Sequence, residues 1–413
     1  MKVLWITNIL FPPICEELNI GSPVVGGWMY SSARTLLDFS TNLKLAVASI
    51  YSGDVFIKKE IENINYYLLP SKGNNTHYQK SLEPHWLKVI KDFGPDLVHL
   101  HGTEFAHGLA FLRTYSNIKS VVSIQGLVSV YARYYLGGLT CMDLLKSITL
   151  RDILKGSLHN EQKKFVQRGE IEIEILRRTQ NIIGRTSWDK VHTWAINPKA
   201  KYHFCNETLR ESFYVNHWKY ENCQHHSIFI SQANYPIKGL HQVLKALPLI
   251  LKYYPDTKVY VAGENVFSAS SISRKLRLSG YGNYIRKLIR KYDLGKVVIF
   301  TGPLDETQMS ERYLNSNVFV CPSSIENSPN SLGEAQLLGT PCVAAYVGGI
   351  PTMMKGLEHW MYRYEEIEML AERVVEIFSL SSNVPDFSIH AVSRHNKTTN
   401  GKRLISIYND ILK

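Results

Sequence analysis

The stretch that decides the fold reads Cys321-Pro-Ser-Ser-Ile-Glu326-Asn-Ser-Pro-Asn-Ser331-Leu-Gly-Glu334-Ala-Gln-Leu-Leu-Gly-Thr-Pro341. An apolar run ends near Pro322, a polar turn follows, and a helical pattern begins near Ser331, which predicts a buried strand, a loop and a helix. In an open α/β sheet, ligands bind where loops leave the carboxyl ends of strands. A helix start presents N–H groups and a positive dipole end that suit a diphosphate. Glu326 lies in the turn and Glu334 near the helix start, so both can face one cleft.

The same letters also allow a purely structural interpretation. Ser331 followed three residues later by Glu334 is a capping-box pattern, in which the glutamate only ties off the helix start. The glycine and proline at Gly339 and Pro341 are ordinary helix stop signals. Taken alone, the stretch leaves both interpretations open.

Working outward, short apolar runs alternate with helical patterns along the chain. Strands are expected in the first half at Val3–Thr7, Leu43–Ser49, Ile64–Leu69, Leu97–His101, Val121–Gln125 and Ile182–Thr186, and in the second half at Ile228–Ser231, Lys258–Ala262, Val297–Thr301, Val318–Pro322 and Cys342–Ala345. Apolar strands that alternate with helices indicate parallel sheets covered on both faces. Two such sets predict an α/β protein with two doubly wound domains. We expect the first domain at residues 1–210, the second at 211–395, and a C-terminal helix at 396–413 that returns to the first domain.

Length and composition agree with two globular domains and limit the partners. The chain has 413 residues and a formal net charge of +11, which favours anionic partners. Nucleic acid is not expected, because the basic residues are dispersed and no aromatic-basic RNA-binding signature is present. The N-terminal apolar run is too short for a secretion signal, and no apolar stretch is long enough to span a membrane. Six cysteines without a CxxC pair fit a reducing cytoplasm and argue against a zinc site.

One segment, residues 127–158, interrupts the alternation of strands and helices. It mixes aromatic and basic side chains, among them Tyr131, Tyr134, Lys146 and Arg151, with apolar ones. A lid, an acceptor-facing or membrane-facing insertion and an ordinary helical excursion all remain open.

Several motifs of the second half occur in a specific order. Glu326-x7-Glu334 leads into Ala-Gln-Leu-Leu-Gly-Thr-Pro, and the other motifs are Pro236-Ile-Lys238-Gly239, Val261-Ala-Gly263, Val298-Ile-Phe-Thr-Gly302 and Gly348-Gly349-Ile-Pro. In order and spacing these motifs resemble the signature of the retaining family 4 (group 1) glycosyltransferases. The resemblance implies the GT-B fold, in which two Rossmann-like domains face a cleft.

The resemblance also implies roles for residues of the second half. Glu334 should accept hydrogen bonds from ribose hydroxyls, and Glu326 should contact hydroxyls of the donor sugar. Lys238 fits the lysine of the diphosphate site, where a fixed cation offsets the charge that builds on the departing nucleotide. The backbone N–H groups expected to meet the phosphates are those of Asn330, Ser331 and Leu332.

Two positions depart from the family pattern. Gln232 stands where the family usually has an arginine, and a glutamine donates hydrogen bonds without bringing charge. Thr352 stands where a glutamate is common. Leaving-group stabilisation would then depend on Lys238, on backbone N–H groups and on another basic residue such as Arg185.

The first half offers further candidates. Gly26 and Gly27 end a long Gly/Pro loop. The resemblance implies that this loop lets the backbone approach donor phosphates that a Cβ would obstruct; a plain loop before a helix is the alternative. His99 and His101 share one side of a strand by period two. By resemblance, His101 should reach the reacting sugar or its acceptor, with simple packing as the alternative, while His99 is expected to be packed. Gln125 is a further candidate for the same cleft.

Together these inferences predict a cytoplasmic, metal-independent, retaining glycosyltransferase at or near the inner face of the plasma membrane. It would need no cofactor and would use a UDP- or GDP-linked sugar as substrate. The expected acceptor is a saccharide or a lipid-linked molecule, in surface polysaccharide synthesis, with peripheral membrane contact through electrostatics. A nucleotide-sugar epimerase or a phosphorylase of the same fold, and a carbohydrate-binding protein without catalysis, are the alternatives.

Overall fold

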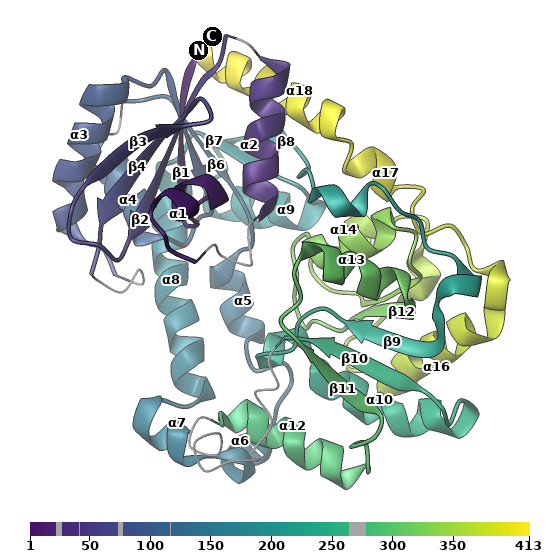
Figure 1. Cartoon of the computed structure of the whole chain (residues 1–413). Coiled ribbons are helices and arrows are strands. Elements are labelled where there is room, and N and C mark those ends of the chain that lie inside the picture. Colours follow the sequence, from purple (N-terminus) through teal and green to yellow (C-terminus); the bar gives the residue numbers. More distant parts are fainter. Residues whose placement is uncertain (22–26, 41, 73–76, 116, 264–277) are drawn as a thin grey trace. The chain divides into compact units, whose positions relative to one another are not determined.

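A computed structural model describes residues 1–21, 27–40, 42–72, 77–115, 117–263 and 278–413 (Figure 1). The chain divides into two compact units. The first comprises Met1–Val130, Lys164–Arg210 and Arg394–Lys413, and the second comprises Tyr131–Lys163 and Glu211–Ser393. The sequence led us to expect residues 131–163 in the first domain, whereas the structure groups them with the second unit.

The first unit is built on an eight-stranded sheet in the order β3-β4-β2-β1-β5-β6-β7-β8. Its strands are β1 Lys2–Thr7, β2 Lys44–Tyr51, β3 Ile57–Ile61, β4 Ile64–Pro70, β5 Leu97–His101, β6 Ser120–Ser123, β7 Asn181–Gly184 and β8 Lys201–Phe204. All neighbours pair in parallel except β3, which joins β4 antiparallel at one edge. The strand order reverses between β1 and β5, and such a switch point leaves a crevice at the carboxyl ends of the strands.

Helices cover both faces of this sheet. They are α1 Pro12–Glu17, α2 Gly27–Phe39, α3 Glu83–Phe93, α4 Ala106–Thr114, α9 Ser187–Ile196 and α18 Lys397–Leu412, with α5 Val128–Tyr134 and α8 Leu158–Arg178 near the boundary of the unit. The C-terminal helix α18 packs on α2, and the Trp5 indole N–H donates to the Tyr408 hydroxyl at 3.0 Å. The predicted return of the C-terminal helix to the first domain is therefore confirmed.

The second unit has a six-stranded parallel sheet in the order β11-β10-β9-β12-β13-β14. Its strands are β9 Gln224–Ile230, β10 Lys258–Ala262, β11 Val298–Gly302, β12 Ser316–Cys321, β13 Cys342–Ala345 and β14 Met361–Tyr362. Its helices are α6 Cys141–Ser147, α7 Leu150–Lys155, α10 Leu240–Tyr253, α12 Gly280–Lys291, α13 Glu306–Leu314, α14 Asn330–Leu337, α15 Ile350–Met353, α16 Ile367–Leu380 and α17 Ala391–Arg394, the last at the boundary of the unit.

Every residue of β12 is buried, as expected for a central parallel strand between two helical layers. The strand order reverses between β9 and β12, so this unit has its own switch point. The fold prediction of an α/β chain with two Rossmann-like domains is confirmed. None of the helices in the described parts of the chain combines the length and apolar composition needed to cross a membrane.

Candidate functional site

A small pocket opens in the second unit at the carboxyl ends of β9 and β12. Four of the residues singled out by sequence line it, namely Gln232, Lys238, Glu326 and Ser331. They come from the segments that follow β9 and β12, on either side of the switch point, with Ser331 in the first turn of α14. The pocket therefore lies where a parallel sheet of this order is expected to bind a ligand.

The local sequence fixes where Lys238 lies. It ends a short 3-10 turn, Pro236–Lys238, and the next residue, Gly239, has a φ of 69° and is the N-cap of α10. A Cβ on Gly239 would lie 1.7 Å from the Pro322 carbonyl oxygen, so the two loops touch backbone to backbone. Only glycine allows both the left-handed conformation and this approach. The Lys238-Gly239 pair thus places the lysine directly beside the end of β12.

Lys238 and Glu326 form a buried ion pair. The Lys238 Nζ lies 2.6 Å from Glu326 Oε1, and the two side chains are 18% and 8% exposed. The Ser323 hydroxyl donates to the same carboxylate oxygen at 2.9 Å. Burial by itself lowers the pKa of Lys238, but the attraction of the Glu326 carboxylate outweighs it, and the net pKa is raised. The lysine therefore carries its charge throughout the physiological range.

A second glycine contact holds Glu326 from the other side. The Gly349 N–H donates to the Glu326 carbonyl oxygen at 2.9 Å, and Gly348 has a φ of 52°. A Cβ on Gly348 would come within 1.9 Å of that carbonyl oxygen. The Gly348-Gly349 pair therefore lets the loop after β13 pack against the backbone of Glu326.

The start of α14 settles the capping-box question. The helix begins at Asn330, its N-cap is Pro329, and no side chain caps it. The alternative of a Ser331–Glu334 capping box is therefore excluded, and Glu334 is a buried residue of the helix that is not among those lining the pocket. Of the three backbone amides expected to meet phosphates, that of Leu332 already donates to the Pro329 carbonyl at 3.1 Å.

Sequence reasoning missed the residues that support the β12 loop from residues 131–163. The Asn327 N–H donates to the Tyr131 hydroxyl at 2.7 Å, and the Ser324 hydroxyl donates to the Tyr134 carbonyl at 3.1 Å. The segment that looked like a lid or an excursion thus buttresses the pocket loop. No local pattern could reveal this, because the partners are almost 200 residues apart.

In the first unit, His101 ends β5 at the switch point. Its ring stacks on His99 at 3.9 Å and lies against Trp5 at 4.3 Å between centroids. Burial, reinforced by the charge of Arg185, lowers the pKa of His101 to about 3. The imidazole is therefore neutral at pH 7. Within the described residues, neither ring nitrogen has a hydrogen-bond partner.

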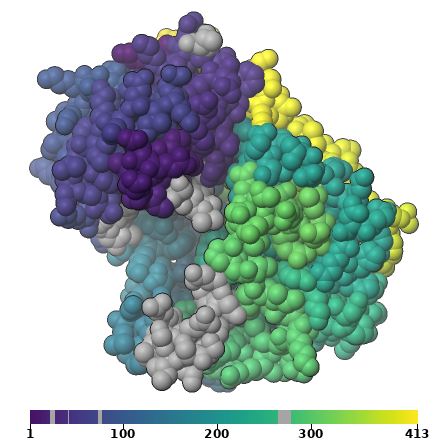
Figure 2. Space-filling model, in the orientation of Figure 1, coloured from purple at the N-terminus to yellow at the C-terminus, as the bar shows by residue number. Residues whose placement is uncertain are grey.

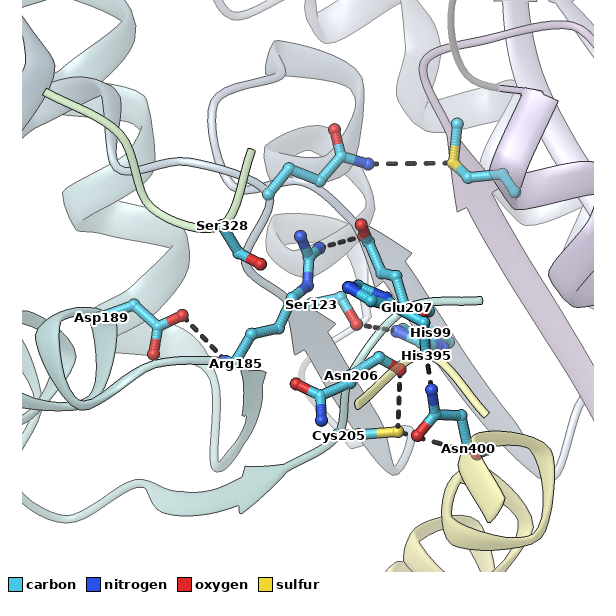
Figure 3. A network of polar contacts seen from close by, with 12 residues as sticks. His99, Ser123, Arg185, Asp189, Cys205, Asn206, Glu207, Ser328, His395 and Asn400 are labelled. Atoms are coloured by element: carbon cyan, nitrogen blue, oxygen red, sulfur yellow. Dashed lines mark hydrogen bonds and ion pairs between the residues drawn. The ribbon is translucent and has the colours of Figure 1, made fainter. Parts of the chain in front are cut away.

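His99 is a packed residue, as expected. Its Nδ1 lies 2.6 Å from the Tyr408 hydroxyl and its Nε2 lies 2.6 Å from the Ser123 hydroxyl, the second contact being visible in Figure 3. Complete burial lowers the pKa of His99 well below its usual value. Both ring nitrogens are committed, which leaves none for a ligand.

Arg185 belongs to a buried polar network of the first unit (Figure 3). Its guanidinium pairs with the Glu207 carboxylate, its backbone N–H donates to Asp189 at 2.9 Å, and its carbonyl accepts from Arg394 at 3.1 Å. The charge that sequence reasoning offered to the leaving group is thus balanced by Glu207 here, and that role of Arg185 stays a prediction.

The remaining first-half candidates have few described contacts. Gly26 lies outside the described residues, and Gly27 is the first residue of α2. A Cβ on Gly27 would meet Arg210 Cδ at an ordinary 3.6 Å, so no contact in the first unit itself demands glycine. The Gln125 amide lies 3.8 Å from the Met29 sulfur. The part of the chain described by the structure contains no group of three or more His, Cys, Asp or Glu arranged to hold a metal. Metal independence stays a prediction.

The second unit matches a known family. Residues 220–391 match the family model described as glycosyl transferases group 1. That range is less than half of the chain, but it contains Lys238, Glu326 and Glu334. The match supports the broad family that the motifs suggested, whereas membership of family 4 and retention of configuration stay predictions.

Curated relatives are distant and partly aligned. A segment of 119 residues, 28% of this chain, is 30% identical to D-inositol 3-phosphate glycosyltransferase 2 of Catenulispora acidiphila and covers 26% of it. The chain therefore spans about a quarter of the length of that relative. A longer alignment of 351 residues, 83% of this chain and 76% of the relative, is 22% identical to the putative glycosyltransferase YtcC of Bacillus subtilis.

Solved structures resemble the whole chain. Sucrose-phosphate synthase from Thermosynechococcus elongatus matches 100% of this chain and 99% of its own, with a TM-score of 0.69 at 13% identity. Anabaena Alr3699/HepE, solved in complex with UDP, matches 99% of this chain and 100% of its own, with a TM-score of 0.64 at 12% identity. These likenesses show the fold, so the predicted GT-B architecture is confirmed.

Proposed function

We propose that the chain is a glycosyltransferase that moves a sugar from a nucleotide-sugar donor to a hydroxyl of a saccharide or lipid-linked acceptor. The observation that carries the proposal is the pocket at the β9–β12 switch point, with its buried Lys238–Glu326 ion pair. The group 1 family match over residues 220–391 and the UDP complex of a structural relative support a nucleotide sugar as the ligand.

The ion pair suits a site that must receive a diphosphate. A buried ammonium needs a counter-ion, and Glu326 supplies it while the pocket is open. When the donor binds, its diphosphate competes for Lys238, and the Glu326 carboxylate becomes available to hydroxyls of the donor sugar. The same two side chains thus stabilise each other first and the donor afterwards.

The chemistry that we propose is same-face substitution. The acceptor oxygen forms a bond to the anomeric carbon on the side from which the diphosphate departs, while the bond between that carbon and the phosphate oxygen breaks. The hydroxyl proton passes to the departing diphosphate, so configuration is retained. Lys238 offsets the charge on the leaving group, which is the main electrostatic contribution available to such a site. It is the only cationic side chain among the described residues that line the pocket.

We assign to His101 a polar role on the acceptor side of the reaction. A neutral imidazole with uncommitted nitrogens can exchange one hydrogen bond with a hydroxyl without adding charge. We further propose that the reaction needs no metal, takes place in the cytoplasm, serves surface polysaccharide synthesis, and brings the protein into peripheral contact with an anionic membrane.

The comparisons favour transfer over the two alternative reactions of the same fold, epimerisation and phosphorolysis. These alternatives predict different products from the same donor. An epimerase would consume a nucleotide sugar without any acceptor and without releasing nucleotide, and a phosphorylase would depend on inorganic phosphate.

A donor screen tests the proposal. Wild-type protein is incubated with UDP- and GDP-linked sugars in EDTA, and binding and slow release of free nucleotide are measured. We expect one donor to bind and hydrolyse slowly, and Glu326→Gln to lower release by about a hundredfold, in the range typical of a lost charge-stabilising contact. Glu311→Gln, on the exposed part of α13, is the matched control. Absence of nucleotide-sugar binding would refute the proposal, and strict dependence on an added divalent ion would refute its metal-free part.

A further inference from the structure

Two helices of the second unit carry their apolar side chains on the outside. In α6 and α7 and the turn between them, six large apolar residues are 50% to 73% exposed, namely Met142, Leu145, Ile148, Leu150, Ile153 and Leu154. The spacings of three and four residues place them along one stripe on each helix. We call these six residues the outer face of α6–α7. Leu145 and Ile148 line one surface hollow, and a group of exposed apolar residues this close in sequence is a candidate interaction surface.

Two small polar residues of the same helices are buried instead. Asp152 of α7 is buried, and its carboxylate accepts the Gly280 N–H at 3.1 Å. Ser147 of α6 is also buried, and its carbonyl accepts from the Asn283 amide at 3.1 Å. An ordinary surface helix has the opposite arrangement, with leucines inward and aspartates outward.

The outward orientation is fixed by caps at both helix starts. Thr140 and Asp143 form a capping box on α6, and Thr149 and Asp152 form another on α7. Each capping box fixes the residue at which its helix begins. It therefore also fixes the side of the helix on which the apolar residues lie. The exposure of the outer face is thus a property of two well-defined helices.

Basic side chains surround the outer face. Lys146 and Lys155 are exposed on α6 and α7, and Arg151 is partly exposed beside them. Helix α12 packs on α6 and adds Lys287 and Arg290, both exposed. Figure 2 shows one face of the molecular surface in the orientation of Figure 1, coloured by residue number. Of the two aspartates on these helices, Asp152 is buried and pairs with Arg151 at 3.7 Å, and Asp143 is only partly exposed, so the exposed charges nearest the apolar stripe are those of the lysines.

We propose that the outer face of α6–α7 is a membrane-contacting surface that inserts its apolar residues among the headgroups of an anionic bilayer. An apolar stripe flanked by lysines and arginines has the chemistry of a helix that lies in the plane of such a surface. Each basic residue near it adds electrostatic attraction to anionic lipid. A protein partner would have to match both the positive rim and a long aliphatic stripe, whereas an anionic lipid surface satisfies both at once.

This inference deepens the proposed membrane contact and is separable from the proposed transfer reaction. Vesicle binding needs no donor or acceptor, and donor hydrolysis needs no membrane. A preparation that hydrolyses the donor but does not bind vesicles would refute the membrane proposal. A preparation that binds vesicles but does not hydrolyse the donor would refute the transfer proposal.

The test is sedimentation of the full chain with vesicles of phosphatidylcholine alone or with about one third phosphatidylglycerol. We expect wild-type protein to bind the anionic vesicles, and the triple variant Leu145→Ser/Ile153→Ser/Leu154→Ser to lose at least tenfold in partition coefficient. The matched control is Val215→Ser/Ile389→Ser/Val392→Ser, which removes three equally exposed apolar residues elsewhere. That control should bind as the wild type does.

Two further readouts make the test specific. Lys146→Gln/Lys155→Gln/Arg290→Gln should weaken binding to anionic vesicles about tenfold or more, whereas Lys219→Gln/Lys252→Gln/Lys296→Gln, with the same loss of charge, should not. Cys141, at the start of α6, is the only exposed cysteine of the six. An environment-sensitive fluorophore on it should shift to the blue and brighten when anionic vesicles are added.

Three results would overturn the inference. Wild-type protein that binds neither kind of vesicle excludes a membrane surface. Equal losses in the outer-face variant and its control show that the stripe is not the contact. Self-association that the outer-face variant abolishes, without vesicle binding by the wild type, would show that the stripe joins two copies of the chain instead.

Discussion

The two units of the chain place different chemistry at the same topological position. At the β9–β12 switch point, the second unit keeps a buried pair of opposite charges, Lys238 and Glu326. At the β1–β5 switch point, the first unit keeps stacked neutral rings, with His101 against His99 and Trp5. Parallel sheets offer a crevice in both places, but the side chains decide what each crevice can hold.

Under the proposed function, the difference reflects the charge of the groups to be bound. A diphosphate requires a fixed cation, and a buried cation requires a carboxylate partner until the ligand arrives. A sugar or acceptor hydroxyl requires only a hydrogen bond, and a neutral imidazole supplies one at no electrostatic cost. The comparison therefore predicts that substitutions at the two switch points should fail in different ways.

The largest loss of transfer activity is expected for Lys238→Met. Removal of the cation should lower transfer by about a thousandfold, the upper range for one lost charge-stabilising group. It also leaves Glu326 buried without its partner, so unfolding free energy should fall by about 3 kcal/mol. Initial rates and urea unfolding measure the two losses. Lys245→Met, two turns further along α10, should change neither by much, and a Lys238 variant with normal turnover would contradict the assignment.

The second-largest loss of transfer activity is expected at His101 and distinguishes it from His99. His101→Asn should lower transfer by about ten- to a hundredfold while stability changes little, because its ring nitrogens bond to none of the described residues. His99→Asn should instead lower the unfolding free energy by about 2 kcal/mol, because it breaks the bonds to Tyr408 and Ser123. Parallel rate and unfolding measurements compare the variants. The same profile for both would remove the distinction between a reacting and a packed histidine.

A smaller and gradual loss of stability is expected when the pH is lowered. The folded-state pKa of His101 is lowered to about 3, and those of His107 and His241 to about 4, in each case chiefly by burial. As the pH is lowered, the unfolded chain takes up these protons at a higher pH than the folded chain does. The contribution of the neutral histidines to the free energy of unfolding is therefore complete above about pH 6.5 and falls as the pH drops toward 4. Each histidine adds a slope of about 1.4 kcal/mol per pH unit within that window. Urea unfolding at several pH values measures it, and His101→Asn should flatten the curve; an unchanged slope would contradict the burial of a neutral ring.

The smallest effect is expected from restoring charge to the donor pocket. Gln232 lines the pocket together with Lys238 and brings no charge of its own. Gln232→Arg should tighten donor binding a few-fold by adding a second cation near the diphosphate. Titration calorimetry with the donor found in the screen checks this. Gln232→Met, which removes the hydrogen bond without adding charge, serves as the comparison, and weaker binding by the arginine variant would show that the pocket has no room for a second cation.

Much of the fold was predictable because the pattern of apolar residues along the sequence is periodic and local. Buried strands such as β12 are continuous apolar runs, and their alternation with helices indicates parallel sheets whatever the tertiary detail. The weak strands were missed for the same reason. β3 has three charged residues, Lys58, Lys59 and Glu60, at its exposed centre, and β8 has only one buried residue, so neither carries an apolar run.

The site was predictable in its residues but not in its contacts. Glu326 and Lys238 were found through motifs, yet their ion pair joins loops 88 residues apart, and no local pattern encodes that distance. The capping-box alternative failed because the N-cap is Pro329 and not Ser331, a shift of two residues that pattern reading cannot resolve. Residues 131–163 were misplaced because their partners, such as Asn327, lie in the other half of the chain.

The glycines at 239 and 348 have a consequence for redesign. Each lets one main chain rest directly on another, so the loops carrying Lys238 and Glu326 are seated against the same scaffold and cannot be reshaped one at a time. A change of donor preference in this chain would therefore have to come from exchanged side chains on an unaltered backbone. Grafting or lengthening either loop would displace both Lys238 and Glu326.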